Sequence, residues 1–183
     1  KLKDLDIYGK TLIIFTSDNG GANYIELDDI NKPFRGWKIS FFEGGIRVPC
    51  LMRWPGRIKA GSTSDEILSA LDLFPTLCAL AKVDVAGQQL DGEDITDILT
   101  GVQKTLPARE LLWHTGSHAE LKRGTWTALR QGDWKFLETS MGDQFLFNLA
   151  QDPYEKANLK AQHPKLFNDL RKRRDVLLSL IHI

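Results

Sequence analysis

The sequence predicts an α/β fold: the C-terminal part of a mixed sheet flanked by helices, followed by a small antiparallel sheet with a C-terminal helix. A continuous apolar run at 11–16 is typical of a strand that is buried on both faces, as in a parallel sheet. Strand patterns separated by turns follow between 125 and 148, which favours an antiparallel sheet. An amphipathic pattern that starts at His163-Pro164 predicts the last helix.

Residues 1–105 are expected to belong to the larger sheet. The strand at 11–16 ends at the polar sequence 17–21, and open α/β sheets bind ligands beyond the carboxyl ends of their strands. Residues 22–40 are expected to form an exposed loop. The further elements predicted here are strands at 51–54 and 67–71, a helix at 73–81 with Asp72 as its N-cap, and a short helix near 95–99.

Residues 106–183 are expected to form a smaller second subdomain. Gly132 and Gly142 lie in the turns between its predicted strands, so neighbouring strands pair antiparallel. The basic run 171–174 on the terminal helix is interpreted as a solvated face. The predicted strands are 125–130, 134–138 and 144–148, and the apolar helix positions are 166, 167, 170, 177, 178 and 181.

The composition argues against some classes of function. The 183 residues carry 24 Lys plus Arg against 24 Asp plus Glu, and this balance gives no support for nucleic-acid binding. No apolar run reaches the roughly 18 residues that a membrane span needs. Cys50 and Cys78 show no disulfide or metal-binding spacing and are expected to be small core residues. Because the chain opens at Lys1 without a signal peptide, we expect it to be part of something longer.

The residues that carry chemistry follow the first predicted strand. Asp18 and Asn19 offer a carboxylate and an amide oxygen, the hard ligands that suit Ca²⁺ or Mg²⁺. Gly20 and Gly21 allow the backbone to turn sharply and approach a ligand. Lys38 could bring a positive charge to the same place, which suggests a substrate anion that is held and polarised. On these residues alone, the alternative is an ordinary turn.

Several short motifs occur in one order along nearly the whole chain. They read Phe-Thr-Ser-Asp-Asn-Gly-Gly at 15–21, Phe-Arg-Gly-Trp-Lys at 34–38, Phe-Glu-Gly-Gly-Ile-Arg-Val-Pro at 42–49, Arg-Trp-Pro-Gly at 53–56, Asp-Leu-Phe-Pro-Thr at 72–76, Leu-Asp-Gly at 90–92, Arg-Gln-Gly-Asp-Trp-Lys at 130–135, and Asp-Pro at 152–153 with Glu155 and Asn158-Leu159. In order and spacing this set resembles the C-terminal portion of the sulfatase family, arylsulfatase-like enzymes of the alkaline phosphatase superfold.

The resemblance implies calcium-dependent hydrolysis of an organic sulfate ester. Asp18 and Asn19 match the family's second pair of divalent-metal ligands, usually for calcium, and Lys38 matches the lysine that contacts the substrate sulfate. Related phosphatases of the same superfold typically carry His after the equivalent Asp, so Asn19 favours sulfate esters. Neutral oxygen donors suit Ca²⁺, whereas imidazole suits zinc.

The family's nucleophile does not occur in this chain. Sulfatases use a formylglycine made from Cys or Ser in a Cys/Ser-x-Pro-x-Arg segment, and the residues after Cys50 and Cys78 do not fit it. The resemblance places this segment, the first metal carboxylates and the Lys and His that assist the leaving group in a missing N-terminal half. We therefore expect the chain alone to be inactive and to bind Ca²⁺ weakly, because two ligands rarely hold the ion.

Weaker candidates surround these residues. The candidates for substrate contact are Arg35 and Trp37 beside Lys38, and His114 and His118 as a leaving-group subsite; the alternative for the histidines is an ordinary surface or core position. Glu43 and Arg47 are expected to form a structural ion pair or turn hydrogen bonds.

Two other functions remain open at this point. One is a phosphate or phosphonate ester hydrolase of the same superfold, and the other is a non-catalytic truncated module. The expected partners are a small-molecule or sugar sulfate ester and the missing half of the protein, without nucleic acid or a membrane span. Periplasmic, secreted or lysosomal localisation is what the resemblance implies.

Overall fold

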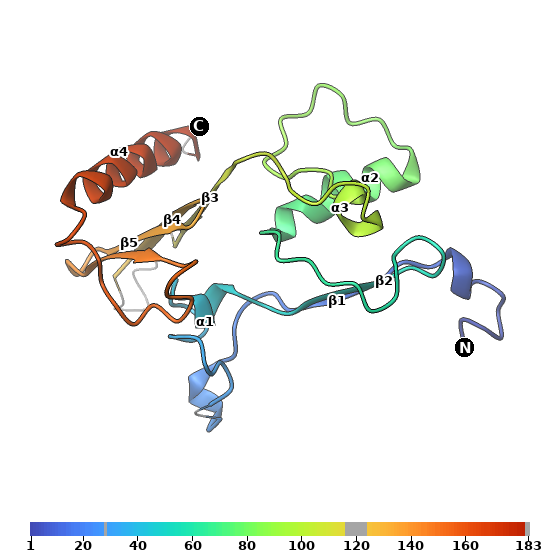
Figure 1. Cartoon of the computed structure of the whole chain (residues 1–183), viewed down its shortest axis with the longest axis horizontal. Coiled ribbons are helices and arrows are strands. Elements are labelled where there is room, and N and C mark those ends of the chain that lie inside the picture. Colours follow the sequence, from blue (N-terminus) through green and yellow to red (C-terminus); the bar gives the residue numbers. More distant parts are fainter. Residues whose placement is uncertain (28, 116–123, 182–183) are drawn as a thin grey trace. The chain divides into compact units, whose positions relative to one another are not determined.

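A computed structural model describes residues 1–27, 29–115 and 124–181, and its contacts divide the chain into two compact units (Figure 1). Unit 1 comprises Lys1–Thr16 and Cys50–Pro107, and unit 2 comprises Ser17–Pro49 and Ala108–Ile183. This grouping differs from the predicted ranges 1–105 and 106–183, because Phe42 packs against the C-terminal sheet and Arg35 and Glu43 bond to Glu155.

The strand pair of unit 1 exposes its apolar side chains. β1 (Ile13–Thr16) pairs antiparallel with β2 (Cys50–Arg53), and Phe15 lies opposite Leu51. Their side chains are 63% and 60% exposed. The expectation of a strand buried on both faces is therefore wrong, because β2 is the one strand that pairs with β1 among the described residues. Cys50 is also exposed, contrary to its predicted core position, and Cys78 is half-buried.

The helices of unit 1 are held by local polar contacts. α2 (Leu73–Ala81) has the predicted bounds, but the carboxylate of Asp72 accepts the backbone N–H groups of Ser69 (2.7 Å) and Glu93 (3.0 Å). The predicted strand at 67–71 is wrong, since these capping bonds favour the 3₁₀ turn η3 (Ala70–Asp72) over an extended chain. The remaining elements are η1 (Tyr8–Lys10) and α3 (Thr96–Thr100).

Unit 2 contains the predicted antiparallel sheet with its C-terminal helix (Figure 1). Its strands pair in sequence order as β3 (Glu110–His114), β4 (Trp126–Gln131), β5 (Trp134–Thr139) and β6 (Gln144–Asn148). The last three strands confirm the prediction, whereas β3 was missed. The short turns Gln131–Trp134 and Thr139–Gln144 set the register, in which Leu129, Phe136 and Leu146 lie side by side.

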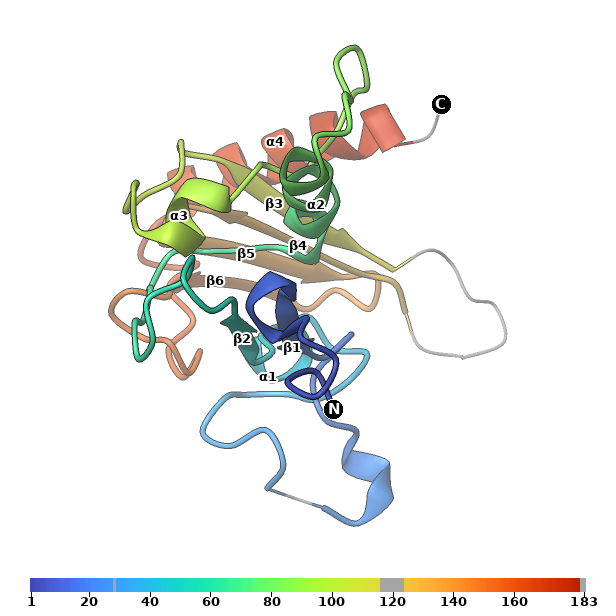
Figure 2. The same ribbon diagram turned by 90° about the vertical axis from the view of Figure 1, so that its right-hand side faces the viewer.

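α4 (Pro164–Ile181) packs along one face of this sheet (Figure 2). Its buried Phe167 and Leu170 contact the cross-strand row of Leu129, Phe136 and Leu146. Within the basic run of this helix, predicted to be solvated, Arg173 pairs with Glu110 at 2.7 Å, and Arg174 and Arg171 pair with Glu138 at 3.0 and 3.4 Å. No described helix is both long and apolar enough to cross a membrane.

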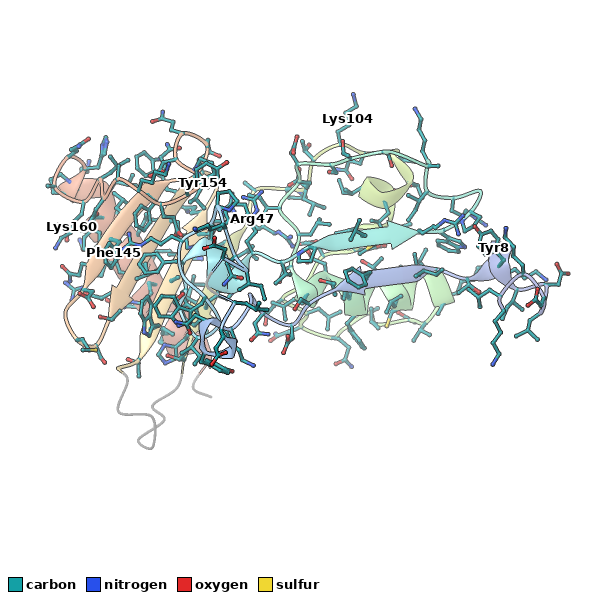
Figure 3. All side chains as sticks on the ribbon, turned by 90° about the horizontal axis from the view of Figure 1, so that it is seen from below. Tyr8, Arg47, Lys104, Phe145, Tyr154 and Lys160 are labelled. Atoms are coloured by element: carbon teal, nitrogen blue, oxygen red, sulfur yellow. The ribbon has the colours of Figure 1, made fainter. Side chains whose placement is uncertain are left out.

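The segment 34–46 covers the opposite face of the same sheet. Phe42 is buried there against the rings of Trp126, Phe145 and Phe147, at centroid distances of 5.3–6.2 Å. The one-turn helix α1 (Glu43–Ile46) follows directly. Figure 3 shows Phe145 among the side chains of the sheet, and also Arg47 and Tyr154, which both contact Phe34. The sheet of unit 2 is therefore packed on both faces. The 3₁₀ turn η2 (Asn23–Ile25) lies in the preceding loop.

The exposed Phe15 and Leu51 predict self-association of the chain. Burial of one such side chain contributes about 1.5–3 kcal/mol, so Phe15→Ser combined with Leu51→Ser should weaken association by about tenfold or more. Light scattering after size-exclusion chromatography over a concentration series measures this. Val102→Ser, which removes an apolar side chain that is also exposed, is the control. A wild-type chain that is monomeric at all concentrations would contradict the prediction.

Candidate functional site

The turn that follows β1 presents the two predicted metal ligands. Asp18 is exposed and Asn19 is half-buried. The side-chain amide of Asn19 donates a hydrogen bond to Oδ1 of Asp18, and the Ser17 hydroxyl donates to the backbone carbonyl of Asn19 at 2.8 Å. The structure thus brings the carboxylate and the amide together at the surface.

Gly20 fixes this turn against α1. Its N–H donates to the carbonyl of Gly45 at 2.9 Å. A Cβ added at Gly20 would lie 1.8 Å from the carbonyl oxygen of Gly44, far inside van der Waals contact. A residue without a side chain is therefore required, because the two backbone segments touch directly.

Asn31 joins the turn to the loop that carries Lys38. Its side chain accepts the Gly21 N–H at 2.7 Å, and its amide donates to the carbonyls of Gly21 at 2.8 Å and Gly36 at 3.2 Å. The Lys38 N–H also donates to the carbonyl of Gly21, at 3.0 Å. Gly21, which follows the turn of Asp18 and Asn19 closely in the chain, is therefore hydrogen-bonded both to Asn31 and to the backbone of Lys38. Asn31 was not predicted, because it lies in the segment 22–40, which is expected to form an exposed loop.

Lys38 lies in a strained turn. Its side chain is half-buried and makes no ion pair within the described residues. Ile39, directly after it, has φ +88°, a region that β-branched residues rarely adopt. The turn is closed by Ser40, whose N–H and hydroxyl both donate to the carbonyl of Trp37, at 3.0 and 2.8 Å. Trp37 keeps 43% of its surface exposed beside the lysine. Strain of this kind persists only where the surroundings enforce it.

The structure places Arg35 in the packing of unit 2. Its guanidinium lies 4.0 Å from the ring centroid of Phe42 and 5.1 Å from that of Phe145. Its Nη1 donates to the carbonyl of Glu155 at 3.1 Å. These contacts orient the loop, and the predicted substrate contact of Arg35 stays a prediction.

Of the two predicted histidines, the structure describes one. His114 ends β3, where its Nδ1 lies 3.0 Å from the hydroxyl of Thr127. Side chains alternate along a strand, so His114 shares the sheet face of Leu112, which packs in the cluster under α4. The segment that carries Lys38 covers the other face. His118 lies outside the described residues.

A buried charge cluster lies between α1 and the sheet. Lys135 on β5 has no solvent exposure, and its Nζ lies 2.7 Å from Oε1 of Glu43 and 2.9 Å from Oε1 of Glu155. The expected pair between Glu43 and Arg47 is present at 3.8 Å, but Lys135 is the closer partner. Burial raises the pKa of the Glu155 carboxyl above its ordinary value, and the charge of Lys135 opposes that shift.

The described part of the chain does not complete a metal site by itself. Within it, no group of three or more His, Cys, Asp or Glu side chains is arranged to hold an ion. Asp18 and Asn19 are hard oxygen donors of the kind that Ca²⁺ takes, but Ca²⁺ takes about six to eight of them. These two residues therefore fit a part of a calcium site.

Comparison with known proteins gives one consistent result. The family model "N-sulphoglucosamine sulphohydrolase, C-terminal" matches residues 36–178. Human arylsulfatase A is 36% identical over 172 residues, which cover 92% of this chain and 33% of the relative. The chain thus spans about a third of that protein.

Two solved structures are similar over nearly the whole chain. Ps i-CgsB superimposes with a TM-score of 0.84 at 31% identity, covering 96% of this chain and 38% of that one. It was also solved in complex with k-i-k-neocarrahexaose. The phosphonate monoester hydrolase of Agrobacterium radiobacter gives a TM-score of 0.71 at 27% identity, covering 98% and 36%.

The strain at Ile39 predicts that a glycine variant at this position is more stable than an alanine variant. Ile39→Gly and Ile39→Ala both remove the side chain beyond Cβ, but only glycine tolerates a positive φ without strain. The glycine variant should therefore be more stable than the alanine variant by about 1 kcal/mol. Urea unfolding of both variants measures the difference. The ordinary order, with alanine equal or more stable, would show that Ile39 is not strained.

The buried carboxyl of Glu155 predicts a pH dependence of stability. With its pKa raised in the folded chain, Glu155 stabilises the fold fully below its unfolded pKa, and this contribution is lost as the pH rises through the folded pKa. Glu155→Gln removes the titration. The unfolding free energy of the wild type, minus that of the variant, should therefore fall from pH 4 upward, as urea titrations at several pH values would measure. A rising difference would mean that Lys135 outweighs burial.

Proposed function

Because the chain belongs to the sulfatase family, whose C-terminal part it matches, we propose that it supplies one half of the active site of a sulfuric ester hydrolase. The observation that carries this proposal is the bonded network of Gly21, Asn31 and Lys38, which ties the turn of Asp18 and Asn19 to the loop of a cationic side chain. A cation site and an anion-binding lysine in one network suit an ester that carries negative charge.

In this proposal Asp18 and Asn19 bind a divalent cation, calcium, together with ligands from another part of a longer protein. The neutral amide of Asn19 and the carboxylate of Asp18 supply oxygen donors only, which suits calcium better than zinc. When bound, the cation would polarise the sulfate group. The formylglycine nucleophile would likewise come from outside this chain, which has no Cys/Ser-x-Pro-x-Arg sequence.

Lys38 would bind the sulfate of the substrate. Its ammonium group makes no ion pair within the part of the chain that the structure describes, so it is available to a ligand oxygen. The strained turn at Ile39 and the bonds of Ser40 fix the direction in which the lysine leaves the backbone. Fixed donors of this kind stabilise charge that develops in a transition state without reorganising.

The substrate would be an organic sulfate ester, either aryl or sugar. Support for a sugar comes from Ps i-CgsB, which binds k-i-k-neocarrahexaose, and from the exposed ring of Trp37 beside Lys38. Aromatic faces pack well against the apolar side of a ring-shaped ligand. Periplasmic, secreted or lysosomal localisation belongs to the same proposal.

A phosphonate or phosphate ester is the second candidate, because the phosphonate monoester hydrolase of Agrobacterium radiobacter is similar over 98% of the chain. Asn19 favours the sulfate ester, since a phosphatase-type site with zinc would gain from imidazole at this position. Hydrolysis assays with matched aryl sulfate and aryl phosphonate esters separate the two candidates.

The test uses the protein as its source produces it. Its intact mass and N-terminal sequence should reveal a longer species with a Cys/Ser-x-Pro-x-Arg segment and the mass loss of formylglycine formation. Lys38→Ala should lower kcat/KM for sulfate esters by about a hundredfold or more, because one charged donor is lost in the transition state. Lys32→Ala, which removes an exposed lysine paired with Asp29, is the matched control and should leave it unchanged. Turnover by the 183-residue chain alone would contradict the divided site.

A further inference from the structure

Glu43, Lys135 and Glu155 bring three segments of unit 2 together without belonging to the candidate site. Glu43 opens α1, Lys135 lies on β5, and Glu155 lies in the turn that follows β6. All three side chains are buried. A buried ion cluster seldom adds net stability, because the desolvation of the charges offsets their attraction. A role in fixing one arrangement of segments is therefore the better explanation.

Glu155 holds the segment of Lys38 at two points. Its Oε2 accepts the N–H of Glu43 at 2.6 Å, and its backbone carbonyl accepts Nη1 of Arg35 at 3.1 Å. Lys38 lies between these two residues in the chain. Glu155 itself has φ +56°, a conformation that costs a non-glycine residue energy and persists where surrounding contacts enforce it.

α1 transmits this anchoring to the site. The Gly45 carbonyl accepts the Gly20 N–H, and the Gly44 N–H donates to the carbonyl of Arg35 at 2.7 Å. The backbone of Gly20 touches Gly44 so closely that no side chain fits between them. A displacement of α1 would therefore move the turn of Asp18 and Asn19.

A second cationic side chain lies next to Lys135 on the sheet. Lys135 lies directly opposite Arg130 on β4, and like charges at such a pair repel each other. Burial lowers the pKa of Arg130, and the charge of Glu43 opposes that shift. Glu43 and Glu155 both pair with Lys135, so the loss of either carboxylate leaves the buried ammonium group less compensated.

We propose that Lys135 and Glu155 are positioning residues for the candidate site: they fix α1, and α1 fixes the turn of Asp18 and Asn19 and the loop of Lys38. The assignment of that site to sulfate ester chemistry rests on the proposed function. The mechanical link from the sheet to the turn rests on the hydrogen bonds and ion pairs alone.

Amide hydrogen exchange of the 183-residue chain tests the link. In Lys135→Met, the amides of Gly20, Lys38, Gly44 and Gly45 should exchange about tenfold faster or more, while those of β4 keep their protection. Equal acceleration of all amides in unit 2, or no acceleration at the four site amides, would overturn the proposal. Lys104→Met, which removes an exposed lysine (Figure 3), is the control.

Glu155→Gln serves as the second variant if Lys135→Met fails to fold. It retains the shape of the side chain but weakens the attraction to Lys135. The same four amides should then exchange faster than those of β4. Unchanged protection at these amides in a folded Glu155→Gln chain would overturn the proposal as well.

A titration with Ca²⁺ alone separates this inference from the proposed function. The amide chemical shifts of Asn19 and Gly20 should respond weakly to Ca²⁺. This response should fall several-fold in Lys135→Met, because the turn is then less firmly held. Asp18→Asn should abolish the response. If Asp18→Asn leaves the response unchanged, the cation site of the proposed function fails, and the exchange experiment still decides the positioning role. If Asp18→Asn abolishes the response but Lys135→Met leaves it unchanged, the positioning role fails.

Discussion

Lys135 is the residue on which the arrangement of unit 2 depends. It carries a full charge at a point without solvent, and its two glutamate partners come from segments more than a hundred residues apart in the sequence. Desolvation of such a charge costs roughly several kcal/mol. The attraction of its partners offsets this cost only while they stay in place. The aromatic cluster around Phe42 packs on the same face of the sheet, and Glu155 bonds to the first residue of α1 beside it.

The charged side chains on the two faces of the sheet differ in how deeply they are buried. Under Phe42 the ion cluster is fully buried, and it specifies position more than it adds stability. Along α4, Arg171 and Arg173 stay about half exposed while they pair with Glu138 and Glu110, and such pairs are worth only about 0–1 kcal/mol. The apolar contacts of Phe167 and Leu170 therefore hold the helix against the sheet. The basic run adds weak ion pairs with glutamates of the strands.

Local patterns in the sequence were sufficient to predict the strands between 126 and 148, α2 and α4. Turns, caps and amphipathic faces depend on residues that are neighbours in the sequence. These patterns failed for β3 and for residues 67–71, where pairing across the sheet and the capping bonds of Ser69 and Asp72 decide the structure. Asp18, Asn19 and Lys38 were predicted from motifs. The contacts that hold them could not be, since Asn31, Lys135 and Glu155 find their partners through the fold.

The chain passes from unit 1 to unit 2 after Thr16, returns at Cys50 and leaves again after Pro107. No single cut can therefore separate the two units. A protein shortened at residue 107 would retain the segment 17–49 but lose the sheet against which Phe42 and Glu43 are buried. Premature stop codons or deletions that remove residues from 108 onward would then act at a distance, by releasing the segment that carries Lys38.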